Sequence, residues 1–325
     1  MTAVGEARAP GRPGPTLRQQ ENRAGLALLS PTLVVVLAVV VLPIAWTIFI
    51  AFRELRLRDI REVGVFGAGF TLDNFVGVFT SRGFFDALIT TVVYSVVGTT
   101  LAIGLGLAAA LLVRAPFRGR TLVRASMLLP YVSPVVAVAF VWSVMLDPNL
   151  GIVNAFGTGV LGWQRPIPFL SQRSADLTLF GMSLGIPTAL VTVIVFQAWR
   201  YFPFAFLFIL ARLQAVPVDL DEAARVDGAT PLQRFRYILL PQLAGVIALL
   251  AVLRFIWTFN EFDDIYLLTG GAAGTEVMSI GVYNRLTGRG DIGAAAAFSL
   301  VLAALLAVFL ILYFRFFARR TDESL

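Results

Sequence analysis

The chain of 325 residues contains no cysteine, no histidine and no lysine, so all 26 of its basic residues are arginine. Without thiolate and imidazole groups it lacks the usual ligands of zinc and haem, and it has no cysteine nucleophile. A P-loop needs a lysine, so the chain cannot hydrolyse ATP through that motif. We therefore expect no catalytic residue, no metal site and no cofactor on this chain. Any ATP and Mg²⁺ that it uses would be bound by a partner.

Charged residues are scarce, at 14% of the chain against about 25% in typical soluble proteins. Hydrophobic residues make up 58%, and the mean hydropathy is +0.82, which indicates a membrane protein. Residues 1–24 are rich in proline, glycine and arginine, which predicts a disordered basic tail. The apolar run over 25–52 is too long for a signal-peptide core and precedes no cleavage pattern, so we expect it to remain as a membrane helix.

Six segments have the length of about 20 apolar residues that a membrane-spanning helix needs. They predict an all-α membrane protein with a transmembrane domain over 25–320 and a C-terminal tail over 321–325. Prolines in the third and fourth segments can be accommodated by neighbouring helices. The predicted spans lie near residues 25–52, 84–113, 124–146, 187–213, 243–265 and 292–317.

The second segment carries a small residue at every fourth position, and this pattern lets another helix approach closely. We interpret it as a helix contact and assign it no further role. The residues are Gly98, Ala102, Gly106 and Ala110.

Arginines are unevenly distributed about these spans. Fifteen fall on the side of the two termini and nine on the opposite side. Because cytoplasmic segments retain positive charge, both termini and the loop 214–242 are expected in the cytoplasm. Loop 53–83 would face outward despite its five arginines, although four acidic residues accompany them.

The charged loop 214–242 contains two helix start signals. Asp219 is placed as an N-cap with Glu222 three positions later, and Gly228 can close the helix in the left-handed conformation. Thr230 and Gln233 repeat the capping pattern, with a proline at the first helical position between them. The loop is therefore predicted to form helix, tight turn, helix.

One face of the first loop helix is nearly flat, since Leu220, Ala223, Ala224 and Asp227 share it at helical spacing. Such a face can lie in a groove of another protein. Glu222 lies off that face, where it could cap the helix or reach a partner's arginine. Pro241 is expected to kink the entry to the fifth span, because its ring removes a backbone hydrogen bond. The simpler alternative is an ordinary connector.

The same loop resembles the signature loop of permease subunits in binding-protein-dependent ABC importers: E-A-A, three residues, G, nine residues, then I-x-L-P. Here these positions are Glu222, Ala223, Ala224, Gly228, Ile238, Leu240 and Pro241. The resemblance implies that the short helix is a coupling helix which docks on a separate ATPase subunit. It implies this role for Asp221, Glu222, Ala223, Ala224, Arg225, Asp227, Gly228 and Pro241, with Glu222 as an ion-pair partner.

The resemblance extends over about residues 25–320 and implies the type I importer permease fold. The stretch 257–271 is similar to the carbohydrate branch of the family, that of the maltose and glycerol-phosphate permeases, although Ala272 and Ala273 replace the usual Gly-Pro. The implied substrate is a sugar, with a disaccharide such as trehalose expected, moved by alternating access. The implied partners are a second, different permease subunit, two ATPase subunits and an extracytoplasmic sugar-binding protein. Loop 53–83 can hold only a small structure.

Charged residues lie in the middle of two spans, at Arg200 and Arg254, where a charge is costly and usually faces the bundle interior. Aromatic faces and amide or carboxylate groups suit a sugar in a mostly apolar, concave site. The candidate substrate-pathway residues are Trp199, Arg200, Tyr201, Arg254, Trp257, Asn260, Glu261 and Asp264. Structural ion pairing and aromatic packing are the alternative interpretations of these residues.

Two other functions stay open from the sequence. An ion-coupled secondary transporter should have acidic residues near the membrane midplane, whereas the acids here gather at the ends of the spans. A membrane subunit that docks partners without transport would use the loop 214–242 as a general docking site.

Overall fold

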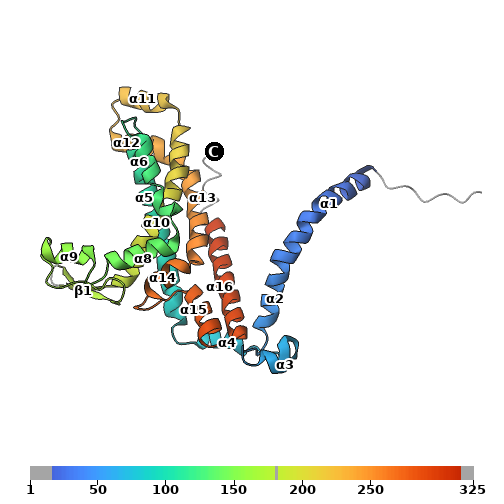
Figure 1. Ribbon diagram of the computed structural model, residues 1–325. Helices are drawn as coiled ribbons and strands as arrows, with labels where there is room; N and C mark the ends of the chain where they lie inside the picture. The colour runs from blue at the N-terminus through green and yellow to red at the C-terminus, as the bar shows by residue number, and fades with distance from the viewer. Residues whose placement is uncertain (1–16, 180–181, 316–325) are drawn as a thin grey trace, which may run out of the picture.

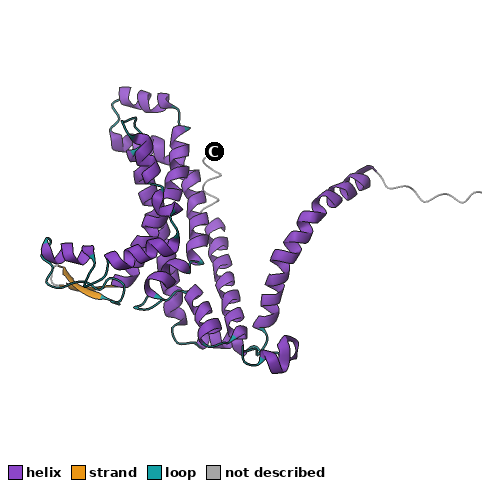
Figure 2. Ribbon diagram, in the orientation of Figure 1, coloured by secondary structure: helices purple, strands orange, loops and turns teal. Residues whose placement is uncertain are grey.

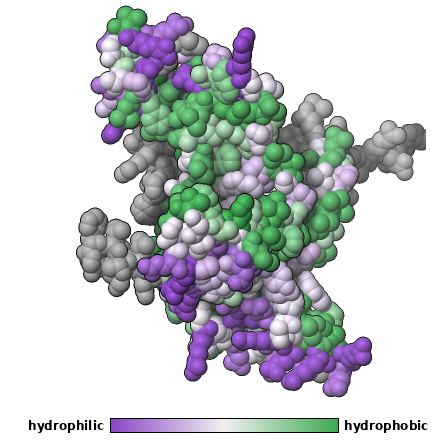
Figure 3. Space-filling view, turned by 60° about the vertical axis from the view of Figure 1, so that its left-hand side comes forward, coloured by the Kyte–Doolittle hydropathy of each residue, from purple (hydrophilic) through white to green (hydrophobic). Residues whose placement is uncertain are grey.

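The computed structural model describes residues 17–179 and 182–315. These residues are almost entirely helical, apart from one two-stranded hairpin (Figure 2). Five helices are long and apolar enough to cross a membrane, and a sharply bent pair would make a sixth. On the face in Figure 3, hydrophilic side chains gather toward the two ends and mostly hydrophobic ones lie between them. The predicted helical class is confirmed, while the number of crossings stays a prediction.

The first span stands apart from the rest (Figure 1). It consists of α1 (Leu17–Val36), the π-helical segment η1 (Leu37–Val41) and α2 (Leu42–Ala51). Side chains over 27–46 are exposed, and α2 packs on the last long helix, α16 (Ile292–Tyr313). The predicted disordered tail 1–24 is therefore too long: residues 17–24 are helical, because Leu, Arg, Gln, Glu and Ala favour a helix once Pro15 is passed. Residues 1–16 lie outside the described part.

The loop 53–83 forms the small structure that its length predicts, with α3 (Ile60–Gly67) and α4 (Asp73–Thr80). Asn74 Nδ2 donates to the carbonyl oxygens of Ala51 and Arg53, each at 2.9 Å. The backbone amides of Ile292 and Gly293 donate to Leu55 O at 3.0 and 3.1 Å. The loop therefore ties the end of the first span to the start of α16.

The centre of the bundle is the pair α5 (Phe84–Leu112) and α10 (Thr188–Gln214), with α13 (Leu240–Phe259) packed beside them. The predicted small-residue contact is confirmed, since all four residues of the stripe are buried. A Cβ on Gly106 would lie 2.7 Å from the backbone nitrogen of Phe206. A Cβ on Gly98 would overlap the amide of Gln197. Glycine at these positions lets α5 and α10 approach closely.

The third span is not the continuous helix predicted over 124–146. It is divided into α6 (Arg120–Ser126), α7 (Leu129–Val132) and α8 (Val135–Met145), and the two halves meet at 95°. The bend falls at Ser133, whose ψ of 142° is extended. Pro134 causes it, because its ring disfavours a helical conformation in the preceding residue.

Between α8 and α10 the chain makes an excursion at one side of the bundle (Figure 1). It contains α9 (Ile152–Gly159) and an antiparallel hairpin of β1 (Ala175–Leu179) and β2 (Met182–Ile186). Buried Asn154 organises its first half: its Nδ2 donates to the carbonyls of Leu146, Asp147 and Ile167, and its Oδ1 accepts from Ile167 N at 2.6 Å. The sequence did not predict these elements.

The fifth span also differs from its predicted limits, 243–265. A continuous helix runs from Pro231 to Phe259 through α12 (Pro231–Arg234), the π-helical η2 (Phe235–Leu239) and α13. It ends before the acidic residues, which belong to the next turn and to α14 (Asp263–Thr269). The chain then forms α15 (Met278–Tyr283) and the π-helical η3 (Asn284–Gly288) before α16. Described residues of the last predicted span end at 315, so 316–317 and the tail 321–325 lie outside the described part.

The turn after α14 contains the two alanines that depart from the family pattern. Gly270, Gly271 and Gly274 have positive φ, and so does Ala273, at 54°. A left-handed conformation costs a residue with a Cβ roughly 1–2 kcal/mol.

Ala273→Gly is therefore expected to raise the unfolding midpoint of the purified protein, with a gain of up to about 1 kcal/mol after the greater chain entropy of glycine is deducted. Thermal unfolding in detergent measures this. Ala272→Gly is the matched control, because Ala272 is not among the positive-φ residues, and it should lower the midpoint. Equal midpoints for the two variants would contradict the assigned strain.

Candidate functional site

The loop predicted to be helix, turn, helix has that structure. Its first helix, α11, runs over Val218–Val226 and projects from one end of the molecule (Figure 1). The predicted N-cap is wrong: Pro217 is the N-cap residue, with φ −56° and ψ 130°, and Asp219 lies inside the helix. The ring of Pro217 already holds the φ value that precedes a helix start, so the helix begins before Asp219 can cap it.

The predicted end of α11 at Gly228 is confirmed. Gly228 has φ +78°, its amide donates to Arg225 O at 3.1 Å, and Ala229 N donates to Ala224 O at 2.9 Å. These two bonds form a Schellman motif, which satisfies the last carbonyls of the helix.

The second capping prediction is also confirmed. Thr230 Oγ1 accepts from Gln233 N at 3.3 Å, and Gln233 Oε1 accepts from Thr230 N at 2.7 Å. This capping box starts the helix that continues through α13. Just before Pro241, η2 widens the helix, and Leu240 N donates to Phe235 O. The wide turn lies where Pro241 provides no amide hydrogen.

α11 is exposed, whereas its attachment to the bundle is buried. Leu220 and Val226 are 45% and 88% exposed, and Glu222 and Ala223 are exposed. Arg212 Nε, at the end of α10, donates to Gln242 O at 3.1 Å near the start of α13. The residues that flank the loop, Leu213, Val216, Leu239 and Leu243, are buried in one core with the end of α5. The loop is thus an exposed helix on a rigid base. The side chain of Asp221 lies outside the described part of the structure.

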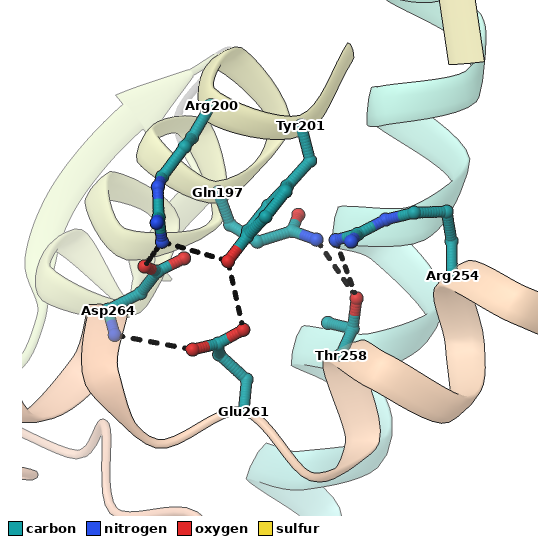
Figure 4. A network of polar contacts seen from close by, with 7 residues as sticks. All are labelled: Gln197, Arg200, Tyr201, Arg254, Thr258, Glu261 and Asp264. Atoms are coloured by element: carbon teal, nitrogen blue, oxygen red, sulfur yellow. Dashed lines mark hydrogen bonds and ion pairs between the residues drawn. The ribbon is translucent and has the colours of Figure 1, made fainter. Parts of the chain in front are cut away.

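Inside the bundle, five of the predicted pathway residues lie together (Figure 4). Arg200 forms an ion pair with Asp264 and donates to Tyr201 Oη at 2.8 Å. Tyr201 Oη donates to Glu261 Oε2 at 3.2 Å. Arg254 lies with Cζ 3.9 Å above the centre of the Tyr201 ring. Residues from α10, α13 and α14 thus form one network around Tyr201.

The network includes two residues that the sequence analysis missed. Thr258 Oγ1 accepts from Gln197 Nε2 and from Arg254 Nη2, both at 3.1 Å (Figure 4). Gln197 was detectable as an amide within an apolar span. Thr258 carried no such signal, because threonine is common in membrane helices. Gly98 on α5 leaves the space that the amide of Gln197 occupies.

Burial makes this network costly unless its groups are paired. Asp264 and Gln197 are fully buried, and Arg254 is 2% exposed. The pairing is incomplete, because five buried atoms in or beside the network have no hydrogen-bond partner within the described chain: Tyr94 Oη, Gln197 Oε1, Arg200 Nε, Arg254 Nε and Asp264 Oδ2. The two arginines balance the charges of Glu261 and Asp264. The network is therefore neutral overall and retains unpaired donor and acceptor atoms.

Of the other three predicted pathway residues, Trp257 lies at the edge of the network, with Arg254 Cζ 5.8 Å from its ring centre, whereas Trp199 and Asn260 make their contacts elsewhere. Trp199 packs against Trp142 with ring centres 5.4 Å apart, and half-exposed Trp257 packs against Phe204 at 5.2 Å. Exposed Asn260 donates to Ile256 O within its own helix. Trp199 instead lines a hollow of about 470 Å³ at the bend before α8. Within the described residues, no group of three acidic side chains could hold a metal ion.

The helical fold, the apolar spans and the exposed capped loop define a polytopic membrane protein. A family model described as "Binding-protein-dependent transport system inner membrane component" matches residues 102–322. The chain belongs to this family. Its members are permease subunits of ABC importers. They have no catalytic activity of their own, and a partner subunit hydrolyses ATP.

Relatives match over most of the chain. The inner membrane ABC transporter permease protein YcjO of Escherichia coli is 34% identical, over 85% of this chain and 88% of its own length. The trehalose/maltose permease protein MalF of Thermococcus litoralis is 32% identical, over 94% and 97%. The trehalose permease protein SugA of Mycobacterium tuberculosis is 30% identical, over 92% and 90%.

Solved structures agree on the fold. A bacterial ABC transporter involved in alginate import contains a chain with a TM-score of 0.75 and 23% identity, over 93% of this chain and 96% of that one. The same values of identity and coverage hold for an alginate transporter in complex with its periplasmic protein, with a TM-score of 0.74. At this identity the likeness shows the fold alone.

Proposed function

We propose that this chain is the permease subunit of an importer for a sugar, with a disaccharide such as trehalose as substrate. The observation that carries the proposal is the neutral polar network within the apolar bundle. Its balanced charges suit an uncharged polyhydroxyl ligand, and its unpaired buried atoms can bond hydroxyl groups. An ion-coupled transporter would instead use uncompensated acidic groups. Two of the similar permeases are named for trehalose, which supports the choice of sugar.

In this proposal Arg200, Tyr201, Arg254, Glu261 and Asp264 contact the sugar on its way through the membrane. Trp199, Trp257 and Asn260 would line the route in another state of the alternating-access cycle. A sugar can shift that cycle only by binding its states with different affinity. Gln197 and Thr258 hold Arg254 in position.

We further propose that α11 docks on an ATPase subunit. Support comes from its exposed small-residue face and from its buried base, which would transmit motion to α5, α10 and α13 together. ATP and Mg²⁺ then belong to two partner ATPase subunits, and a second, different permease completes the membrane core. The end that carries α11 lies in the cytoplasm, with both chain termini on that side, and the opposite end meets an extracytoplasmic binding protein.

Reconstitution of the assembled complex in vesicles tests the function. Uptake of radiolabelled trehalose should require both ATP hydrolysis and the binding protein, and a panel of other sugars should stimulate hydrolysis less. Uptake driven by a proton or sodium gradient without ATP would overturn the proposal. Stronger stimulation by another sugar would replace trehalose but leave the importer function in place.

A further inference from the structure

The end of the molecule opposite α11 carries a hollow of about 400 Å³ lined by arginines. It lies between the turn that joins α4 to α5 and the segment around η3. Residues near the starts of α5 and α16 also line it. Arg82 lies on the first wall and Arg285 and Arg289 on the second. A single acid, Glu276, lines the same hollow, so positive charge is in excess there.

Arg285 is held in place and lines this arginine hollow. Its Nη1 donates to Gly281 O at 2.9 Å, and its Nη2 donates to Ser81 Oγ at 3.0 Å. Its Cζ lies 3.8 Å from the centre of the Phe298 ring. A Cβ on Gly281 would lie only 3.1 Å from that ring, so glycine makes this arrangement possible. These contacts join α4, α15 and α16 into a rigid frame.

The other two arginines are exposed. Within the described residues neither Arg82 nor Arg289 has an acidic group within 4.0 Å. Burial, and next the nearby charge of Arg289, lower the pKa of Arg285 from its usual value. Like charges held together in this way favour the binding of an anion, because a carboxylate can take charge-assisted bonds from more than one guanidinium.

The surroundings restrict which anion fits. A second hollow, of about 270 Å³, shares Arg285 and Arg289 and is lined by the acids Glu54, Asp73 and Asp291. Side chains of both signs of charge therefore lie at this end. A phospholipid surface or a polyanion would be repelled by the acids, whereas a protein surface with both signs of charge would match them.

We infer that the arginine hollow takes a carboxylate side chain of the extracytoplasmic binding protein, with Arg82 and Arg289 as its ligands. The inference rests on the proposed importer function. The rigid frame around Arg285 would hold the walls of the hollow in place, which limits the ordering that docking requires.

The inference is tested with the complex reconstituted in phosphatidylcholine vesicles. Trehalose-loaded binding protein is added at increasing concentration, and the stimulation of ATP hydrolysis is measured. Arg289→Glu and Arg82→Glu should each raise the half-saturating concentration of binding protein at least about tenfold, with the same maximal rate at saturation. Arg289→Lys should retain most of the affinity. Arg61→Glu is the matched control, since Arg61 is an exposed arginine of α3 outside both hollows. Reversal of the matching acid on the binding protein should restore the affinity of Arg289→Glu.

The outcomes separate the two proposals. If wild-type complex is stimulated and Arg289→Glu behaves as Arg61→Glu does, the docking inference is overturned and the importer function stands. If the defect appears only in vesicles with anionic phospholipid, the hollow binds lipid headgroups and the inference is again overturned. If the binding protein stimulates no complex with any sugar of the panel, both proposals fail.

Discussion

Ala223→Trp in α11 is expected to abolish coupled sugar uptake while the protein still inserts in the membrane. The exposed face around Ala223 is nearly flat, and an indole ring there would hold the helix away from any groove that fits it. Loss of such a central contact costs at least about 2 kcal/mol of docking free energy, roughly 30-fold in affinity. Co-purification of the ATPase and sugar uptake in vesicles measure the effect. Glu222→Ala should weaken docking in the same direction.

Leu232→Trp is the control for this experiment. Leu232 is 73% exposed on α12, in the same loop but outside α11. It should leave co-purification and uptake near the wild-type level. Normal ATPase binding by Ala223→Trp would refute the assignment of α11 as the coupling helix.

Asp264→Asn is expected to lower both stability and uptake. It leaves Arg200, whose side chain is 13% exposed, without its ion-pair partner, and breaking a buried ion pair on one side costs about 3–5 kcal/mol. Thermal unfolding in detergent and uptake at saturating sugar give the two readings. Asp263→Asn is the matched control, because the adjacent Asp263 is exposed, and it should change neither.

A double variant separates stability from transport. Arg200→Met with Asp264→Leu removes both charges, and such replacements of a buried pair are often neutral or stabilising. We expect stability to recover while uptake stays low, since the hydroxyl-binding groups are gone. Recovery of uptake in the double variant would mean that the ion pair is structural, and the pathway assignment of these two residues would be wrong.

Local features of the fold were predictable from the sequence. Gly228 and the Thr230–Gln233 capping box depend on residues a few positions apart, so their chemistry can be recognised without the rest of the chain. The small-residue stripe of α5 likewise predicted a helix contact, although not that α10 would be the partner. The N-cap was wrongly assigned to Asp219, because it lies two residues earlier, at Pro217, and the helix begins at Val218.

Apolar length predicts a crossing but not its shape. The bend at Ser133 follows from Pro134, yet whether a membrane proline bends a helix depends on its neighbours: Pro203 lies inside the continuous α10. The two hairpin strands alternate apolar and polar residues, but each has only five residues, and neither was predicted. The second loop helix and the fifth span, predicted separately, form one continuous helix from Pro231 to Phe259.

In the candidate site, too, single residues were predictable from the sequence and their contacts were not. Arg200 and Arg254 were identified because a charge inside a membrane is rare, and Glu261 and Asp264 were candidates beside them, but which groups pair with one another was not predicted. Arg200 meets Asp264 from 64 positions away, and Gln197 meets Thr258 from 61. Such contacts depend on how each helix is rotated about its axis, and no local pattern encodes that rotation.

By itself the sequence determined the membrane class, the lack of a P-loop lysine and the capped helix-turn-helix loop, because each follows from composition or from residues close together in the chain. Only the tertiary structure decided which intramembrane polar groups pair and that arginines distant in the sequence share one hollow. The physical reason is that buried charges must find partners across helices, and packing selects those partners only when the whole bundle is formed.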